Sequence, residues 1–167
     1  MGCWISKRGK PARGETSIKD FRAQTLKAHN QRRKKHGSPA LKLSSNLNEY
    51  AQKWADHLVK SKTFQHSDCK MNGTQLGENI ATKWSSDHAD YTGEEVTEQW
   101  YDEIKKHNFS SEGSTGTGHF TQVVWKETKQ LGVGKAKDGN GKIIIVASYL
   151  PAGNLIGSFT KNVLPLK

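Results

Sequence analysis

Apolar residues recur with the period of an α-helix in two stretches of the first half of the chain. The first stretch begins at Ser17, with Asp20 three residues later in a capping-box pattern, and ends at Gly37. The second begins near Ser45 and carries a stripe that we expect to be core: Leu47, Tyr50, Ala51, Trp54, Ala55 and Leu58. Both stretches are therefore predicted to be helices with one buried face.

The second half of the chain changes from helical to strand-like patterning. Thr92 and Glu95 form a capping-box pattern that opens a third helix, and residues 119–125 predict a short fourth one. Residues 131–137 and 143–150 predict two strands joined by a tight turn. The segments predicted to be loops are 64–91 and 108–118. Because helices precede strands, the predicted class is α+β with an antiparallel sheet.

Positive charge is concentrated at the N-terminal end of the chain, whose 167 residues carry a formal net charge of +10. Residues 1–42 hold twelve Lys or Arg and two acidic residues, whereas residues 43–167 hold fourteen of each. Such a segment is typical of proteins that bind anionic lipid or nucleic acid, or of a solvated basic helix. Nucleic acid is the less expected partner, because aromatic stacking platforms are not interleaved with the basic residues.

The first residues are predicted to form an acylated, flexible basic arm over 1–16, ahead of a domain over 17–167. Gly2 and Ser6 fit the N-myristoylation pattern, and Cys3 is placed for palmitoylation. One myristoyl chain binds membranes only marginally, with a constant on the order of 10⁴ M⁻¹, so a second signal is needed. A palmitoyl chain on Cys3 would be one such signal. Basic residues that face the membrane surface would be another, namely Lys7, Arg8, Lys10 and Arg13.

The cysteine content and the start of the chain favour a reducing compartment. Cys3 and Cys69 are too few for the disulfide framework of a secreted domain, and no secretory signal precedes the basic residues. No apolar run approaches the ~18 residues of a membrane-spanning helix. Asn72 and Asn108 begin glycosylation sequons that we expect to stay unmodified. The expected location is the cytosolic face of a membrane, not the secreted fraction.

Common catalytic signatures are absent from the sequence: there is no G-x-S-x-G, H-E-x-x-H, P-loop or C-x-x-C motif. Four residues with acid–base or metal-binding side chains are the candidates for a site: His66, Glu78, Glu103 and His119. Their spacing alone does not select them, because five further histidines are equal candidates by type: His29, His36, His57, His88 and His107.

The sequence motifs around these candidates are more specific than their spacing. Residues 118–125 read GHFTQVVW and residues 149–155 read YLPAGNL, while residues 28–33 read AHNQRR and residues 76–81 read LGENIA. The first two resemble the signatures of the CAP superfamily (cysteine-rich secretory, antigen 5 and pathogenesis-related proteins), and the others its first-helix and GEN motifs. With the few cysteines, the resemblance is strongest to the intracellular, Golgi-associated plant pathogenesis-related branch.

This resemblance implies an α-β-α sandwich with a central antiparallel sheet and a cleft that holds a tetrad of His66, Glu78, Glu103 and His119. In the family the two histidines bind Zn²⁺ and the two glutamates line the same site, so we expect a weak, open zinc site. The resemblance also implies binding of acidic phospholipids or sterols, protein partners and a homodimer, at Golgi or plasma membranes. One departure is that Ala147 and Ser148 stand where secreted members carry a cysteine.

An enzyme is the alternative function. A metal-dependent or serine-type hydrolase would use the same tetrad, with Ser67, Ser85 or Ser86 near it in the sequence. No nucleophile elbow or fixed pair of nucleophile and base is present in the sequence. We therefore expect a binding protein in preference to a catalyst.

Overall fold

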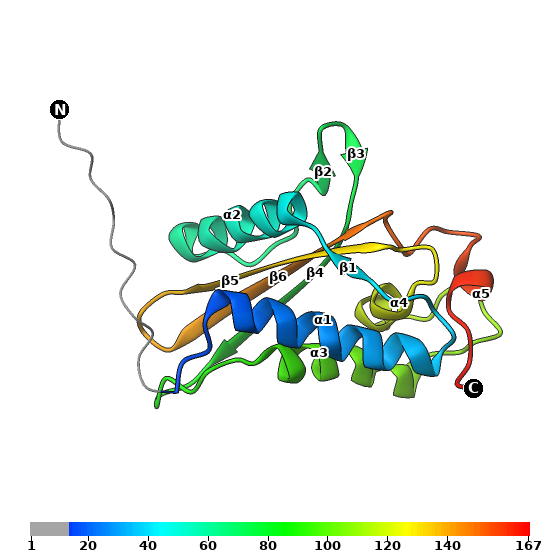
Figure 1. Ribbon diagram of the computed structural model, residues 1–167, viewed down its shortest axis with the longest axis horizontal. Coiled ribbons are helices and arrows are strands. Elements are labelled where there is room, and N and C mark those ends of the chain that lie inside the picture. The colour runs from blue at the N-terminus through cyan, green and yellow to red at the C-terminus, as the bar shows by residue number, and fades with distance from the viewer. Residues whose placement is uncertain (1–13) are drawn as a thin grey trace.

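A four-stranded sheet separates two layers of helices in the computed structural model, which describes residues 14–167 (Figure 1). The expected α+β class and the α-β-α sandwich are confirmed. Several predicted residues lie outside the described part of the chain, namely the acylation sites Gly2 and Cys3 and the basic residues Lys7, Arg8, Lys10 and Arg13.

The sheet is built on an antiparallel hairpin of β5 (Gln130–Lys137) and β6 (Lys142–Leu150), and its strand order is β1-β5-β6-β4. Strand β4 (Gly77–Trp84) pairs antiparallel with β6, and the short β1 (Lys42–Leu43) pairs parallel with β5. The prediction of an antiparallel sheet therefore holds for every pair except β1 with β5.

The prediction that residues 64–91 form a loop is wrong in part. This segment contains β4 and a two-stranded ribbon of β2 (Lys70–Met71) and β3 (Thr74–Gln75). The strand was missed because it opens with Gly77, Glu78 and Asn79, which hide the alternation of apolar and polar residues that marks a strand. Glu78 and Asn79 belong to the candidate site, so the site itself obscured the pattern.

Helix α2 (Ser45–Ser61) covers one face of the sheet and packs mainly on β5 and β6. Ala51, Ala55 and Leu58 from its predicted stripe are buried, whereas Tyr50 and Trp54 are only partly buried. The helix approaches the sheet closely because Gly132 in β5 has no side chain. A Cβ atom there would lie 2.1 Å from the Leu47 carbonyl carbon, far inside van der Waals contact.

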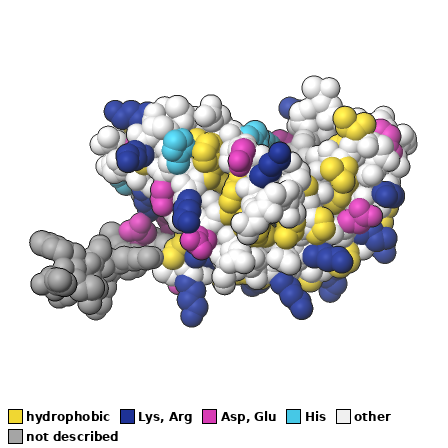
Figure 2. Space-filling model, turned by 90° about the horizontal axis from the view of Figure 1, so that it is seen from above, with side chains coloured by type: hydrophobic (Ala, Val, Ile, Leu, Met, Phe, Trp, Pro, Cys, Tyr) yellow, Lys and Arg dark blue, Asp and Glu magenta, His cyan; other side chains and the backbone are white. Residues whose placement is uncertain are grey.

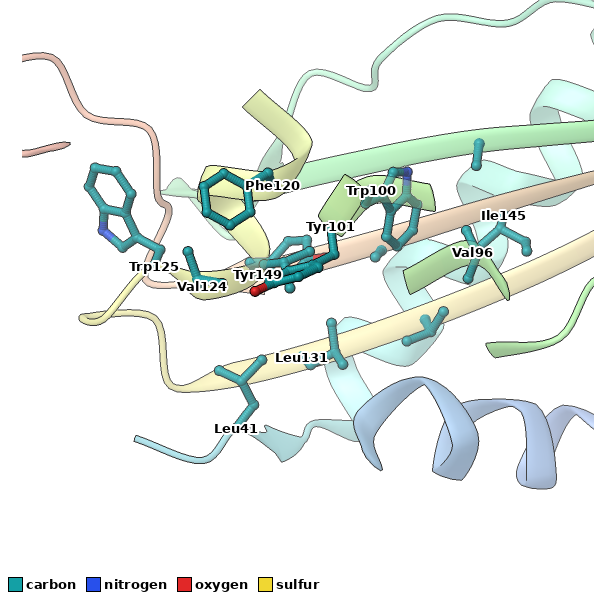
Figure 3. Close-up of a cluster of buried hydrophobic side chains, with 14 of the residues drawn as sticks. Leu41, Val96, Trp100, Tyr101, Phe120, Val124, Trp125, Leu131, Ile145 and Tyr149 are labelled. Carbon is teal, nitrogen blue, oxygen red and sulfur yellow. The ribbon is translucent and has the colours of Figure 1, made fainter. Parts of the chain in front are cut away.

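The other face of the sheet carries the main core, under α1 (Ile18–Lys35), α3 (Gly93–Tyr101) and α4 (Gly118–Val124). Its largest buried side chains include Trp100, Phe120, Trp125 and Tyr149, which belong to one hydrophobic cluster (Figure 3). The 3₁₀ helix η1 (Asp102–Lys106) continues α3, and α5 (Phe159–Asn162) closes the chain near its end.

One basic residue of α1 is wholly buried in this core. Arg33 donates hydrogen bonds to four backbone carbonyls, those of Pro39, Val123, Trp125 and Thr128. Burial lowers the pKa of Arg33 to about 10. Arg32 pairs with Glu98, so the run Arg32-Arg33-Lys34-Lys35 is less of a solvated basic surface than its sequence indicates. Arg33, the last residue of the first-helix motif, is therefore a structural residue.

The start of the described chain is attached to the domain. The Glu15 carboxylate lies 2.6 Å from Lys137 Nζ, and the Thr16 amide donates to Asp90 at 3.0 Å. Asp90 in turn accepts a hydrogen bond from Lys135 at 2.5 Å. Contacts of the folded domain thus begin before Ser17, within the segment predicted to be part of the arm.

The described surface is strongly polar. Figure 2 shows acidic and basic side chains interspersed over the face seen from above, with hydrophobic side chains between them. Within residues 14–167, none of the helices combines the length and the apolar character needed to cross a bilayer.

Candidate functional site

The first histidine–glutamate pair joins the segment after α2 to the sheet. His66 precedes β2, and Glu78 is the second residue of β4. His66 Nδ1 lies 2.7 Å from Glu78 Oε1, which also accepts from the Ser67 amide at 2.9 Å. The Ser67 hydroxyl donates to the other carboxylate oxygen at 2.5 Å. The Glu78 side chain is 1% exposed and that of His66 is 55% exposed, so a buried carboxylate holds an accessible imidazole.

The second pair joins the 3₁₀ helix to α4. His119 Nδ1 lies 2.9 Å from Glu103 Oε2, and Glu103 Oε1 accepts from the amides of His119 and Phe120 at 2.9 and 3.0 Å. Glu103 therefore satisfies free amides in the first turn of α4 while it orients the imidazole. The Trp100 ring stacks on His119, with centroids 6.2 Å apart, and fixes its plane.

Asn79 links the two pairs. Its side-chain amide donates to the His119 carbonyl at 3.1 Å and to the Tyr149 hydroxyl at 3.2 Å. Because Asn79 follows Glu78 directly in β4, this bond places α4 beside the strand that carries the first pair. The GEN motif therefore has two roles: Asn79 joins α4 to β4, and Glu78 is a residue of the candidate site.

Both imidazoles use the same nitrogen, Nδ1, toward a carboxylate. A carboxylate accepts from Nδ1–H, and this assigns the tautomer in which Nε2 carries a lone pair. Within the described residues no hydrogen bond engages Nε2 of either ring. This carboxylate–histidine arrangement is the one found behind metal-binding histidines, so the donor set fits Zn²⁺. The hydrogen bond that His66 donates to Glu78 raises the pKa of His66, against a smaller lowering by partial burial.

The tetrad predicted from the resemblance is arranged as two pairs rather than as one compact ligand cluster. Among residues 14–167, the group of three or more candidate ligands with atoms within 4.8 Å of one another is His66, Cys69 and Glu78. His119 and Glu103 are not members of that group. Cys69 is a neighbour of the site that the sequence motifs did not indicate, although its position three residues after His66 is a spacing that suits two ligands to one metal.

The serines considered for a hydrolase are not paired with an imidazole. Ser67 donates to Glu78, Ser85 donates to Asp87, and Ser86 is exposed. In the part of the chain that the structure describes, no serine hydroxyl is hydrogen-bonded to His66 or His119.

The sequence matches a known family over most of its length. The model of the cysteine-rich secretory protein (CAP) family matches residues 26–149. The chain is also 49% identical to the Homo sapiens protein named Golgi-associated plant pathogenesis-related protein 1 over 157 residues, which cover 92% of this chain and 99% of that protein.

Solved structures agree with this match. The structure of BmVAL-1 has a TM-score of 0.67 at 24% identity and covers 92% of this chain and 84% of its own. The crystal structure of NaASP2 with Zn2+ has a TM-score of 0.63 at 25% identity, with 95% and 91% covered. The first shows a shared fold, and the second is a structure of a similar protein together with zinc.

Proposed function

The chain belongs to the CAP family, and from that membership we propose that it is a peripheral membrane protein that binds anionic phospholipid surfaces and holds Zn²⁺ at His66 and His119. The observation that carries the lipid-binding part is the outer face of α1. Lys19, Lys27 and Lys34 are exposed along it, and Lys35 is exposed at its end. No acidic residue of the described chain forms an ion pair with these four lysines.

The basic face continues a basic segment. Lys7, Arg8, Lys10 and Arg13 precede α1 in the sequence, and no acid lies among them. Each lysine or arginine near an anionic membrane contributes roughly 1 kcal/mol to binding, which is a weak force singly and a strong one collectively. Fatty acylation at Gly2 and Cys3 would add the second signal that stable anchoring requires. The similarity to a protein named as Golgi-associated supports the Golgi as the location.

Vesicle flotation tests the electrostatic part on the full chain produced without acylation. We expect flotation with vesicles of phosphatidylcholine and phosphatidylserine at low ionic strength, and loss of it at high ionic strength. Lys27→Glu with Lys34→Glu should weaken binding by more than about 30-fold, because losing the two lysines alone costs roughly 1 kcal/mol each and the new carboxylates add repulsion. The matched control is Lys60→Glu with Lys70→Glu, which changes the net charge equally away from α1. Equal effects of both variants would contradict a membrane-facing α1.

The zinc part depends on the Nε2 atoms of the two imidazoles, which the carboxylates leave available. His66 and His119 would supply the protein nitrogens, while Glu78 and Glu103 orient the rings. A zinc ion with two protein ligands keeps open positions, where it would act as a Lewis acid. The structure of the similar protein NaASP2 with Zn2+ supports zinc as the metal.

Isothermal titration of the full chain with zinc tests the assignment. His66→Ala and His119→Ala should each remove most of the binding heat, because each deletes one of two nitrogen ligands. His57→Ala is the matched control, since His57 is an exposed histidine of α2 outside the site. Unchanged isotherms in the first two variants would exclude the two-histidine site.

A further inference from the structure

A thiol lies beside the first histidine–glutamate pair. His66, Cys69 and Glu78 each present one ligand atom, and these three atoms lie within 4.8 Å of one another. The His66 ring nitrogen that faces the carboxylate is Nδ1, at 2.7 Å. Sulfur, imidazole nitrogen and carboxylate oxygen are the three donor types that zinc and its thiophilic relatives use in proteins.

The backbone around the thiol is fixed by hydrogen bonds. Cys69 has a φ of 54°, a left-handed conformation that a non-glycine residue rarely adopts. Its amide donates to the Ser67 hydroxyl at 3.0 Å, and its carbonyl accepts from the Leu76 amide at 2.7 Å. The Tyr50 hydroxyl of α2 contacts Ser67 at 2.8 Å. The segment is thus attached to α2 on one side and to the start of β4 on the other.

The carboxylate is the rigid part of the group. Glu78 projects from a strand paired along its whole length with β6, and its side chain is almost fully buried. Zinc bonds of about 2.0–2.3 Å require ligand atoms about 3.5 Å apart in a tetrahedral site. Side-chain rotations of His66 and Cys69 would close the remaining distance without moving the strand.

We propose that Cys69, His66 and Glu78 form a thiolate-containing site for a thiophilic divalent cation such as Cd²⁺ or Zn²⁺. On binding, the Cys69 thiol releases its proton to solvent and the His66 proton moves from Nδ1 to Nε2, so that the sulfur and Nδ1 can each donate an electron pair to the metal. This site shares His66 with the proposed function but uses Nδ1 where the two-histidine site uses Nε2. Because Nδ1 cannot both donate to Glu78 and bind a metal, the two sites are alternative states of one histidine.

Cadmium titration of the full chain with Cys3→Ser tests this site, because Cys69 is then the one thiol in the sequence. Under reducing conditions we expect a thiolate-to-cadmium charge-transfer band in the ultraviolet, which saturates at one equivalent. Adding Cys69→Ser should abolish the band and weaken cadmium binding on the order of ten-fold or more. Adding Cys69→Ala serves the same purpose if the serine variant is unstable, and near-ultraviolet circular dichroism checks the fold.

Two further variants separate this inference from the proposed function. His119→Ala should keep the cadmium band, because His119 lies outside the three-residue group, whereas His66→Ala should lose it. A Cys3→Ser protein that binds cadmium without the band overturns the thiolate site and leaves the two-histidine site standing. If the cadmium band persists and His119→Ala leaves zinc binding unchanged, the thiolate site stands and the two-histidine site is overturned.

Discussion

Two groups of histidines differ in how many of their ring nitrogens have hydrogen-bond partners. One group lies in α1 and at its C-terminal cap, and the other forms the candidate site. His29 and His36 are fully buried, and both ring nitrogens of each are occupied. His29 donates to the Thr25 carbonyl and accepts from the Tyr149 hydroxyl, each at 2.8 Å. His66 and His119 instead satisfy one nitrogen with a carboxylate and leave the other directed away from it.

The difference teaches how to separate a structural histidine from a ligand. Burial lowers the pKa of His29 to about 4 and also lowers that of His36, whereas the Glu78 carboxylate raises the pKa of His66. A ring with two neutral partners is held uncharged inside the core. A ring backed by a carboxylate is held in one tautomer and keeps a lone pair for a metal.

Replacing a buried histidine should have the largest effect on stability. His29→Ala leaves a cavity and deprives the Tyr149 hydroxyl and the Thr25 carbonyl of a partner, which should lower the free energy of unfolding by about 3–4 kcal/mol. Urea unfolding measures it. Zinc affinity in the folded variant should change far less than in His119→Ala, since His29 contacts Tyr149 and Trp100 but neither His66 nor His119. A loss below about 1 kcal/mol would mean that the two classes of histidine do not differ as described.

Acid should destabilise the protein through the same residue. The folded pKa of His29, about 4, lies below the unfolded value of about 6.5, so its contribution is fully present above pH 6.5 and is lost as pH falls toward 4. Between about pH 7.5 and pH 5 this should remove about 2 kcal/mol of stability. His29→Gln, which does not titrate, should show a shallower fall over that range. Equal slopes in both proteins would assign the acid sensitivity to other groups.

Removing one carboxylate should weaken the site without harming the core. Glu78→Gln keeps an acceptor oxygen for the Ser67 amide but loses the charge behind His66. Zinc affinity should fall on the order of ten-fold, and the pKa of His66 should fall because its carboxylate partner is gone. Calorimetry and proton NMR titration of the imidazole measure the two effects. Lys60→Glu, a surface charge change outside the site, provides the comparison.

The smallest effect is expected at a histidine of neither class. His57 is exposed on α2, where its ring stacks on Trp54 with centroids 4.7 Å apart. His57→Ala should change the free energy of unfolding by less than about 0.5 kcal/mol and should not alter zinc binding. A larger loss in urea unfolding would show that ring stacking at the surface matters as much as a hydrogen bond in the core.

The helices were predictable because their signals are local. The capping patterns at Ser17 and Thr92 and the stripe beginning at Leu47 lie within a few turns of the residues that they order. Strand β4 was not predictable by alternation, because its first residues are selected by contacts to α4 and to the segment before β2. Its pairing with β6 joins residues far apart in the sequence.

The residues of the candidate site were indicated by motifs and not by spacing. The words around Glu78 and His119 resemble family motifs, whereas nothing in their separation indicates that each glutamate lies behind one histidine. The buried roles of His29 and Arg33 were equally hidden, because the partners of Arg33 include carbonyls more than 90 positions away. Cys69 belongs to none of the four motifs. Only its position three residues after His66 could have indicated it as a metal ligand.

The attachment of Glu15 and Thr16 decides where a mechanical load enters the domain. If the residues before Gly14 are held at a membrane, any pull reaches the fold first at Lys137 and Asp90, on the β5 strand and at the approach to α3. The force is then shared between sheet and helical layer, and α1 is not peeled from its end. The domain would thereby be held through a strand that is paired along its whole length inside the central sheet.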